Sequence, residues 1–159
     1  MCSSDLECDA EPLIIAVKAW VWNGPVIGSS YLWAASGGNV VTEFVGEWCT
    51  DFMGYTSLPL LSPVNMLEGY SMSSGIANPV MGSFSINSSG ILTLTLTNEA
   101  YIIDIVHVFV GTYDELVSTI GYSVFRGPGC PLYDTSDLWQ HFDAPNNSNT
   151  FSTPSPVIP

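Results

Sequence analysis

The chain has 159 residues, of which 15 are Asp or Glu and only two, Lys18 and Arg126, are basic, so its formal net charge is −13 at pH 7. Two basic residues cannot form a patch that binds a phosphate backbone, which excludes nucleic acid as a partner and disfavours anionic membrane surfaces. Polyacidic chains are usually disordered, yet 47% of this chain is apolar, which is enough for one folded domain with its own core. No apolar run reaches the roughly 18–20 residues that span a bilayer.

Residues 1–12 are acidic and contain Cys2 and Cys8. We expect them to form an arm outside the folded domain. They have neither the basic start nor the apolar stretch of a signal peptide. If the protein is secreted, we therefore expect this chain to be its mature form.

Residues 13–22 alternate at strand spacing. The predicted core face of this strand consists of Ile15, Val17, Ala19 and Val21. The opposite face carries Trp20 and Trp22 beside the only lysine, and is predicted to be half exposed or to meet a partner. We expect this strand to be the best donor or acceptor for strand addition between copies of the chain.

Short strands are predicted at 31–35 and 39–45. Residues 54–80 differ from these, because three prolines and three glycines interrupt them without a clear period. We predict a long irregular excursion there, with one helical turn near Val64–Leu67. Loops of this length inside a compact domain are usually functional.

The second half of the chain has the clearest strand pattern. Residues 83–87 and 91–97 flank the loop Asn87-Ser88-Ser89-Gly90, which predicts a hairpin with Gly90 at positive φ. In its second strand, leucines at alternate positions face the core and threonines face water. Residues 101–110 are apolar on both faces, which predicts a central or interface strand, and 119–125 predict a further strand.

Residues 144–159 are rich in Asn, Ser, Thr and Pro, which predicts an extended linker, a stalk or an arm that docks elsewhere. Many short strands punctuated by Gly and Pro, with no helical period, predict an all-β fold. We expect one antiparallel β-sandwich over 13–143, of the immunoglobulin-like or jelly-roll-like kind. Extended arms would flank this domain at both ends.

The four cysteines form no C-x-x-C motif, which makes a zinc or iron–sulfur site a poor interpretation. Their even number predicts two disulfides in an oxidising compartment, with Cys49–Cys130 and Cys2–Cys8 as the favoured pairing of three. Four buried free thiols are the alternative. The triplets at Asn87 and Asn146 match the acceptor pattern for N-glycosylation.

No complete catalytic signature is present, so we predict that the protein is not an enzyme. Gly69-Tyr70-Ser71-Met72-Ser73 lacks the last glycine of a nucleophile elbow. His107 lies in mid-strand among apolar residues and is interpreted as a buried histidine rather than a general base, and His141 as a surface residue. A Cys/His nucleophile pair using Cys49 or Cys130 is the remaining catalytic alternative.

The acidic balance makes cations the expected charged partners, Ca²⁺ above all. The first candidate site contains Asp134, Asp137 and Asp143, and the pair Asp114-Glu115 follows a strand end. Ca²⁺ takes six to eight oxygen ligands, often from irregular loops. A solvated acidic surface is the alternative, and no other cofactor is expected. A second, weaker candidate consists of Glu43, Glu47 and Asp51.

Trp20 and Trp22 lie on one strand face, about 6.5–7 Å apart by strand rise. That spacing would align two rings under a sugar chain. The alternative is that both tryptophans are core or interface anchors.

Three segments resemble a pattern found in uncharacterised secreted β modules of microbial and algal surface proteins. They are residues 47–51, 105–111 and 127–133, which read EWCTD, IVHVFVG and GPGCPLY. The resemblance implies a secreted domain that is displayed or polymerised. Together with the high apolar content, it predicts a self-assembling structural subunit of an extracellular filament or surface layer, and so a homo-oligomer or polymer. A carbohydrate-binding module using Trp20 and Trp22 is the alternative.

Overall fold

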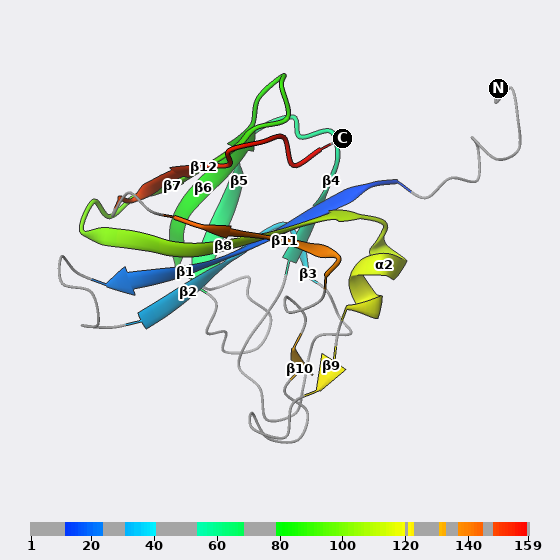
Figure 1. Ribbon diagram of the computed structural model, residues 1–159, viewed down its shortest axis with the longest axis horizontal. Helices are drawn as coiled ribbons and strands as arrows, with labels where there is room; N and C mark the ends of the chain where they lie inside the picture. Colours follow the sequence, from blue (N-terminus) through cyan, green and yellow to red (C-terminus); the bar gives the residue numbers. More distant parts are fainter. Residues whose placement is uncertain are drawn as a thin grey trace, which may run out of the picture.

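The computed structural model describes residues 12–23, 31–40, 54–68, 79–119, 121–122, 131–132, 137–144 and 148–158. Within these ranges the chain forms antiparallel strands and one short helix, α2 (Figure 1). The all-β, antiparallel part of the fold prediction is confirmed. The strands and helix are β1 (Ile14–Asn23), β2 (Tyr31–Ser36), β3 (Asn39–Val40), β4 (Gly54–Ser57), β5 (Val64–Glu68), β6 (Val80–Ile86), β7 (Leu92–Leu96), β8 (Tyr101–Gly111), α2 (Tyr113–Ser118), β9 (Gly121–Tyr122), β10 (Pro131–Leu132), β11 (Trp139–Asp143) and β12 (Thr150–Ser152).

One ten-stranded sheet dominates the fold, and it curls into a half-barrel (Figure 1). Eight of its strands follow the order β11-β8-β1-β2-β5-β6-β7-β12, while β4 pairs with β1 and β3 pairs with β4. Strands β9 and β10 form a separate pair. Among the described residues, the structure does not show two separate sheets packed face to face.

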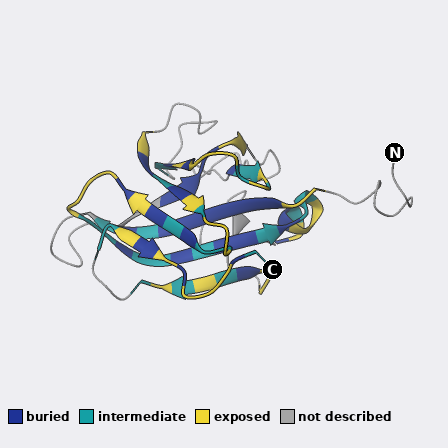
Figure 2. Ribbon diagram, turned by 90° about the horizontal axis from the view of Figure 1, so that it is seen from above, coloured by how far each residue is buried: buried dark blue, intermediate teal, exposed yellow. Residues whose placement is uncertain are grey.

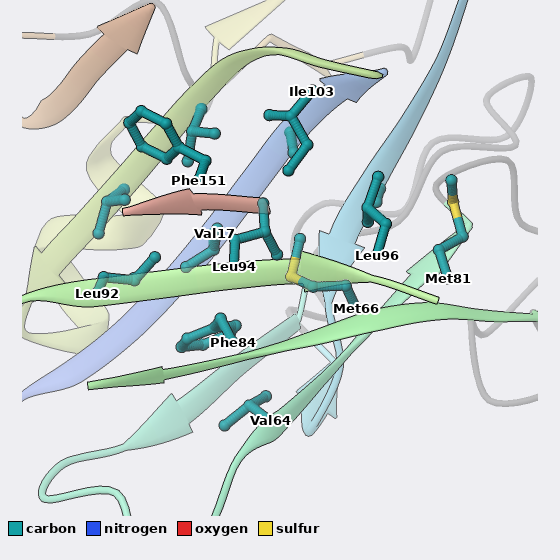
Figure 3. Close-up of a cluster of buried hydrophobic side chains, with 14 of the residues drawn as sticks. Val17, Val64, Met66, Met81, Phe84, Leu92, Leu94, Leu96, Ile103 and Phe151 are labelled. Atoms are coloured by element: carbon teal, nitrogen blue, oxygen red, sulfur yellow. The ribbon is translucent and has the colours of Figure 1, made fainter. Parts of the chain in front are cut away.

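The concave side of the half-barrel holds the main core (Figure 3). Side chains from both halves of the sheet meet there, so that Val17 of β1 lies in the same cluster as Phe84 of β6 and Leu94 of β7. The predicted core faces of residues 13–22 and 91–97 are confirmed, because all of their members are buried in this cluster. Those members are Ile15, Val17, Ala19, Val21, Leu92, Leu94 and Leu96.

The predicted hairpin between β6 and β7 is also confirmed. The side-chain oxygen of Asn87 accepts hydrogen bonds from the amides of Ser89, at 2.9 Å, and Ile91, at 3.0 Å. Gly90 has φ of 83°, in the left-handed region that favours glycine. Local turn chemistry thus fixes the register that directs every leucine of β7 inward.

Strand β1 is central, with β2 on one side and β8 on the other. It therefore cannot donate or accept an added strand along most of its length, and that prediction is wrong. Strand β8 lies between β1 and β11, which confirms its predicted central position. A buried hydroxyl joins β1, β2 and β4, because Ser36 Oγ accepts from the Val17 amide and donates to the Gly54 carbonyl.

The segment 54–80 contains two strands where an irregular excursion was predicted. The expected helical turn near Val64–Leu67 is wrong, because β5 buries Val64 and Met66 while Asn65 between them is exposed. Pro59 and Pro63 fall in the connection between β4 and β5 and hide the short period of two on either side. Residues 69–78 lie outside the described ranges.

Helix α2 was not predicted, and it replaces the start of the strand expected at 119–125. Thr112 caps the helix, since its hydroxyl accepts from the Glu115 amide and the Glu115 carboxylate accepts from the Thr112 amide. Thr119 ends it as the C-cap. The helix buries Leu116 against the convex face of the sheet, in a second cluster completed by Ile14, Ala16, Phe109 and Trp139. The side chains of residues 120–125 lie outside the described part of the chain.

Candidate functional site

The sheet ends at β11 on one side and β12 on the other, and these two strands are consecutive in the chain. The chain between them passes from one edge of the sheet to the other. Its backbone hydrogen bonds reach β8 at one end and β7 at the other. The bonds join the Ala144 amide to the Asp104 carbonyl at 2.8 Å, the Ile103 amide to the Ser148 carbonyl at 2.9 Å, and the Leu96 amide to the Asn149 carbonyl at 2.8 Å.

Residues 148–158, here called the C-terminal segment, fill the open side of the half-barrel. Strand β12 pairs with β7 and directs Phe151 into the main core, as Figure 3 shows. Thr153 and Val157 are also buried. The Thr153 amide donates to the Leu92 carbonyl at 2.9 Å, and the Val157 amide donates to the Gly90 carbonyl at 2.9 Å. The segment therefore extends the sheet and completes its core.

The same segment also contacts the opposite edge of the sheet. The side-chain amide of Gln140 in β11 donates to the Val157 carbonyl at 3.0 Å. The rings of Phe142 and Phe151 lie 6.1 Å apart between centroids. The expectation of a tail that extends away from the domain is thus wrong for residues 148–158. The apolar Phe151 and Val157, spaced within a polar stretch, are the signal that composition alone obscured.

The predicted tryptophan platform lies on the convex face of β1, where Trp20 and Trp22 are half-buried. The ammonium of Lys18, itself only 5% exposed, lies 4.4 Å from the centroid of the Trp20 ring. The edge of the same indole meets His107 of β8 at 4.7 Å between centroids. Trp20 is therefore engaged within the chain by a cation–π contact and an aromatic contact.

The two histidines come together across β8 and β11. Their rings stack with centroids 4.0 Å apart and planes inclined by 17°, because the strand register places His141 directly opposite His107. His107 is half-buried and His141 is exposed. Trp20 and His141 thus flank His107 on the convex face. Cys49 and Cys130, the thiols of the catalytic alternative, lie outside the described residues.

The candidate Ca²⁺ ligands fall into separate places where they are described. Asp137 and Asp143 are exposed near β11, whereas Asp114 and Glu115 occupy the first turn of α2. The Glu115 carboxylate accepts from the Thr112 amide at 3.0 Å and so serves as a helix cap. Among the described residues, no three His, Cys, Asp or Glu side chains are grouped to hold a metal ion. The other candidates, Asp134, Glu43, Glu47 and Asp51, lie outside those ranges.

The predicted covalent features are placed only in part. Asn87 is exposed in the hairpin loop, the kind of position that glycosylation requires. Asn146 and all four cysteines lie outside the described residues. Both disulfides and the second glycosylation site stay predictions.

Comparisons with protein-family models, curated proteins and solved structures give no match for this chain. In the part of the chain that the structure describes, no helix has both the length and the apolar character needed to cross a bilayer. Function is therefore argued from the geometry alone.

Proposed function

We propose that this protein is a secreted structural subunit that assembles with copies of itself into an extracellular filament or surface layer. The observation that carries the proposal is the C-terminal segment, which joins a sheet that does not close on itself. A segment that completes its own domain through one edge strand can complete a neighbouring copy in the same way. Such an exchange creates links between copies without any new type of contact.

The contacts of the segment support exchange between copies. It contributes a three-residue strand, the buried side chains Phe151 and Val157, and backbone bonds to β7. The same groups would satisfy the same groove in another copy, so the cost of opening one domain is offset when the next is completed. A head-to-tail exchange that does not close into a ring produces a linear polymer.

We further propose that the two halves of the sheet act as two layers of a sandwich-like domain. In this arrangement β11-β8-β1-β2 forms one layer and β5-β6-β7-β12 the other. The single core cluster supports it, since Val108 of β8 and Leu94 of β7 belong to the same buried group. The acidic surface would then face solvent, where cations such as Ca²⁺ reduce repulsion between neighbouring copies.

The test is the native mass of the non-reduced protein in solution, measured by light scattering with Ca²⁺ and again with a chelator. We expect species much heavier than the 17.1 kDa chain, and partial dissociation when Ca²⁺ is removed. A synthetic peptide of residues 148–158 should compete for the groove and shorten the polymer. The same peptide carrying Phe151→Asp should have no effect.

A matched pair of chain variants separates exchange from other modes of association. Phe151→Asp places a charge in the core and should abolish assembly, whereas Thr150→Asp adds the same charge at an exposed neighbouring position. A 17.1 kDa monomer at every concentration and in both buffers would contradict the proposal. Polymers that persist in Phe151→Asp would locate the interface elsewhere.

The alternative proposal is a carbohydrate-binding module that uses Trp20 and Trp22. Its support is that both indoles remain partly exposed on one strand face. Trp20 is already covered by Lys18 and His107, which leaves less free ring surface than two open indoles would offer. Replacing both tryptophans with Ala should abolish retention on a glycan matrix if this proposal holds. Unchanged retention would exclude the platform.

A further inference from the structure

A cavity of about 320 Å³ lies on the convex side of the sheet, where β3, β4 and the start of α2 meet. Its aromatic wall consists of Tyr55 and Tyr113, whose ring centroids are 5.1 Å apart with planes inclined by 55°. The buried side chain of Ile14 also lines it. The volume lies at the lower end of the roughly 300–1,000 Å³ typical of ligand pockets, which suits one small ring-shaped group.

Three polar side chains complete the lining, namely Asn39, Ser57 and Asp114. Asn39 is paired with Tyr55 across β3 and β4, and Ser57 follows two residues later on the same face of β4. Among the described residues, none of these three side chains is hydrogen-bonded to another protein group. A donor amide, a hydroxyl and a carboxylate therefore converge beside an aromatic wall with their bonding capacity available to a ligand.

The pocket is fixed in place by the local fold rather than by a ligand. The capping box at Thr112 and Glu115 sets where α2 begins, and so positions Tyr113 and Asp114. Pairing of Ile14 with Ser57 holds β4 against the central strand β1. A preformed site loses less free energy to ordering when a ligand binds.

The charges and donors restrict the class of ligand. A chain of net charge −13 with Asp114 in the lining repels anions. A simple ammonium ion would use only acceptors and leave the Asn39 amide donors without a partner. A neutral sugar has hydroxyls that both donate and accept, and an apolar C–H face that packs on a tyrosine ring. We propose that this cavity binds one unit of a neutral sugar.

The site goes beyond the assembly proposal, because none of its residues belongs to the C-terminal segment. It also differs in place from the tryptophan platform on β1. Sugar binding here would let an assembled subunit hold a glycan while β12 serves its structural role. Each activity can then fail without the other.

The experiment uses the full-length protein and measures binding of neutral methyl pyranosides, and of their short oligomers, by ligand-observed NMR and calorimetry. Tetramethylammonium chloride serves as the probe for a cation site. We expect saturable binding of at least one neutral sugar and none of the ammonium probe. Binding of tetramethylammonium in place of every sugar would overturn the proposal, as would the absence of any saturable sugar binding.

The decisive variant is Asn39→Ala with Ser57→Ala, since both side chains are exposed and can be shortened without opening the core. Loss of two hydrogen bonds should weaken sugar binding by at least about tenfold. The matched control is Asn65→Ala with Ser85→Ala, which removes the same two side-chain types from exposed positions on other strands. Trp20→Ala with Trp22→Ala should retain binding. Equal affinity in the decisive variant and the control would overturn the assignment.

Discussion

The two walls of the half-barrel are built on different rules. In β7 the leucines are buried while Thr95 between them is exposed, so that wall has one core face and one solvent face. In β1 every residue from Ile14 to Ala19 is buried, because the convex face is covered as well (Figure 2). The difference shows that period-two alternation describes a strand covered on one side only. A strand without alternation indicates that a second layer exists, but not what forms it.

The cover over β1 and β8 comes from distant parts of the chain. Leu116 of α2 and Trp139 of β11 pack on Phe109 and on the outer residues of β1. The indole N–H of Trp139 donates to the Thr119 hydroxyl at 3.2 Å, which ties β11 to the end of the helix. The predictions below test how far this cover matches the concave core, and how far each wall depends on its neighbours.

Removal of the C-terminal segment should have the largest effect. Deleting residues 148–159 exposes the groove beside β7 and loses the burial of Phe151 and Val157, at about 1.5–3 kcal/mol for each side chain. We expect the free energy of unfolding to fall by about 3–6 kcal/mol in urea titrations. An unchanged urea midpoint would mean that the segment is an accessory arm, as the composition of residues 144–159 suggests.

The second prediction compares a phenylalanine from each face. Phe84 lies in the concave core and Phe109 under the convex cover, and each is 1% exposed. Phe84→Ala and Phe109→Ala should each cost about 3–5 kcal/mol of unfolding free energy. If Phe109→Ala costs under about 1 kcal/mol, the cover yields readily and the convex cluster is not a second core. Circular dichroism at rising urea concentration distinguishes the two results.

The helix cap gives a smaller effect. Thr112→Ala removes the hydroxyl that accepts from the Glu115 amide, and should cost about 1 kcal/mol. Thr112→Ser keeps that acceptor and should restore most of the loss. Because Tyr113 and Asp114 follow the cap, Thr112→Ala should also weaken sugar binding at the proposed cavity. Full stability in Thr112→Ala would show that packing of Leu116, and not the cap, holds the helix.

The smallest effect on stability is expected at the hairpin loop. Ser89→Ala removes the acceptor triplet at Asn87 but keeps the Asn87 oxygen that receives the Ser89 and Ile91 amides. Stability should change by less than about 0.5 kcal/mol. When the protein is produced in a glycosylating host, the variant should lose the mass of one glycan. An unchanged mass in the variant would rule out modification at this position.

Local chemistry determined which features could be predicted. The core faces of β1 and β7 follow from side-chain period, and the hairpin at Gly90 follows from turn chemistry, so both could be found in the sequence. Strands β4 and β5 could not, because they are short and separated by prolines. Helix α2 is only six residues long, too short for a 3.6-residue period to stand out.

The candidate site depends on contacts that no local pattern encodes. Phe151 meets Phe142 and Leu94 only because the chain crosses from one edge of the sheet to the other. Similarly, Tyr55 and Tyr113 are 58 positions apart in the sequence and come together through the fold. Composition correctly identified residues 144–159 as polar and proline-rich, but it could not show that two apolar side chains among them complete the core.

The burial of Lys18 affects how the protein meets digestive enzymes. Proteases of the trypsin type cleave after lysine or arginine, and this chain offers them only Lys18 and Arg126. Lys18 lies in the middle of β1, paired on both sides and 5% exposed. Cleavage there requires the central strand to leave the sheet, and the exposed loops that proteases usually attack carry no lysine. The fold and the composition together make the subunit a poor substrate for one of the commonest classes of extracellular protease.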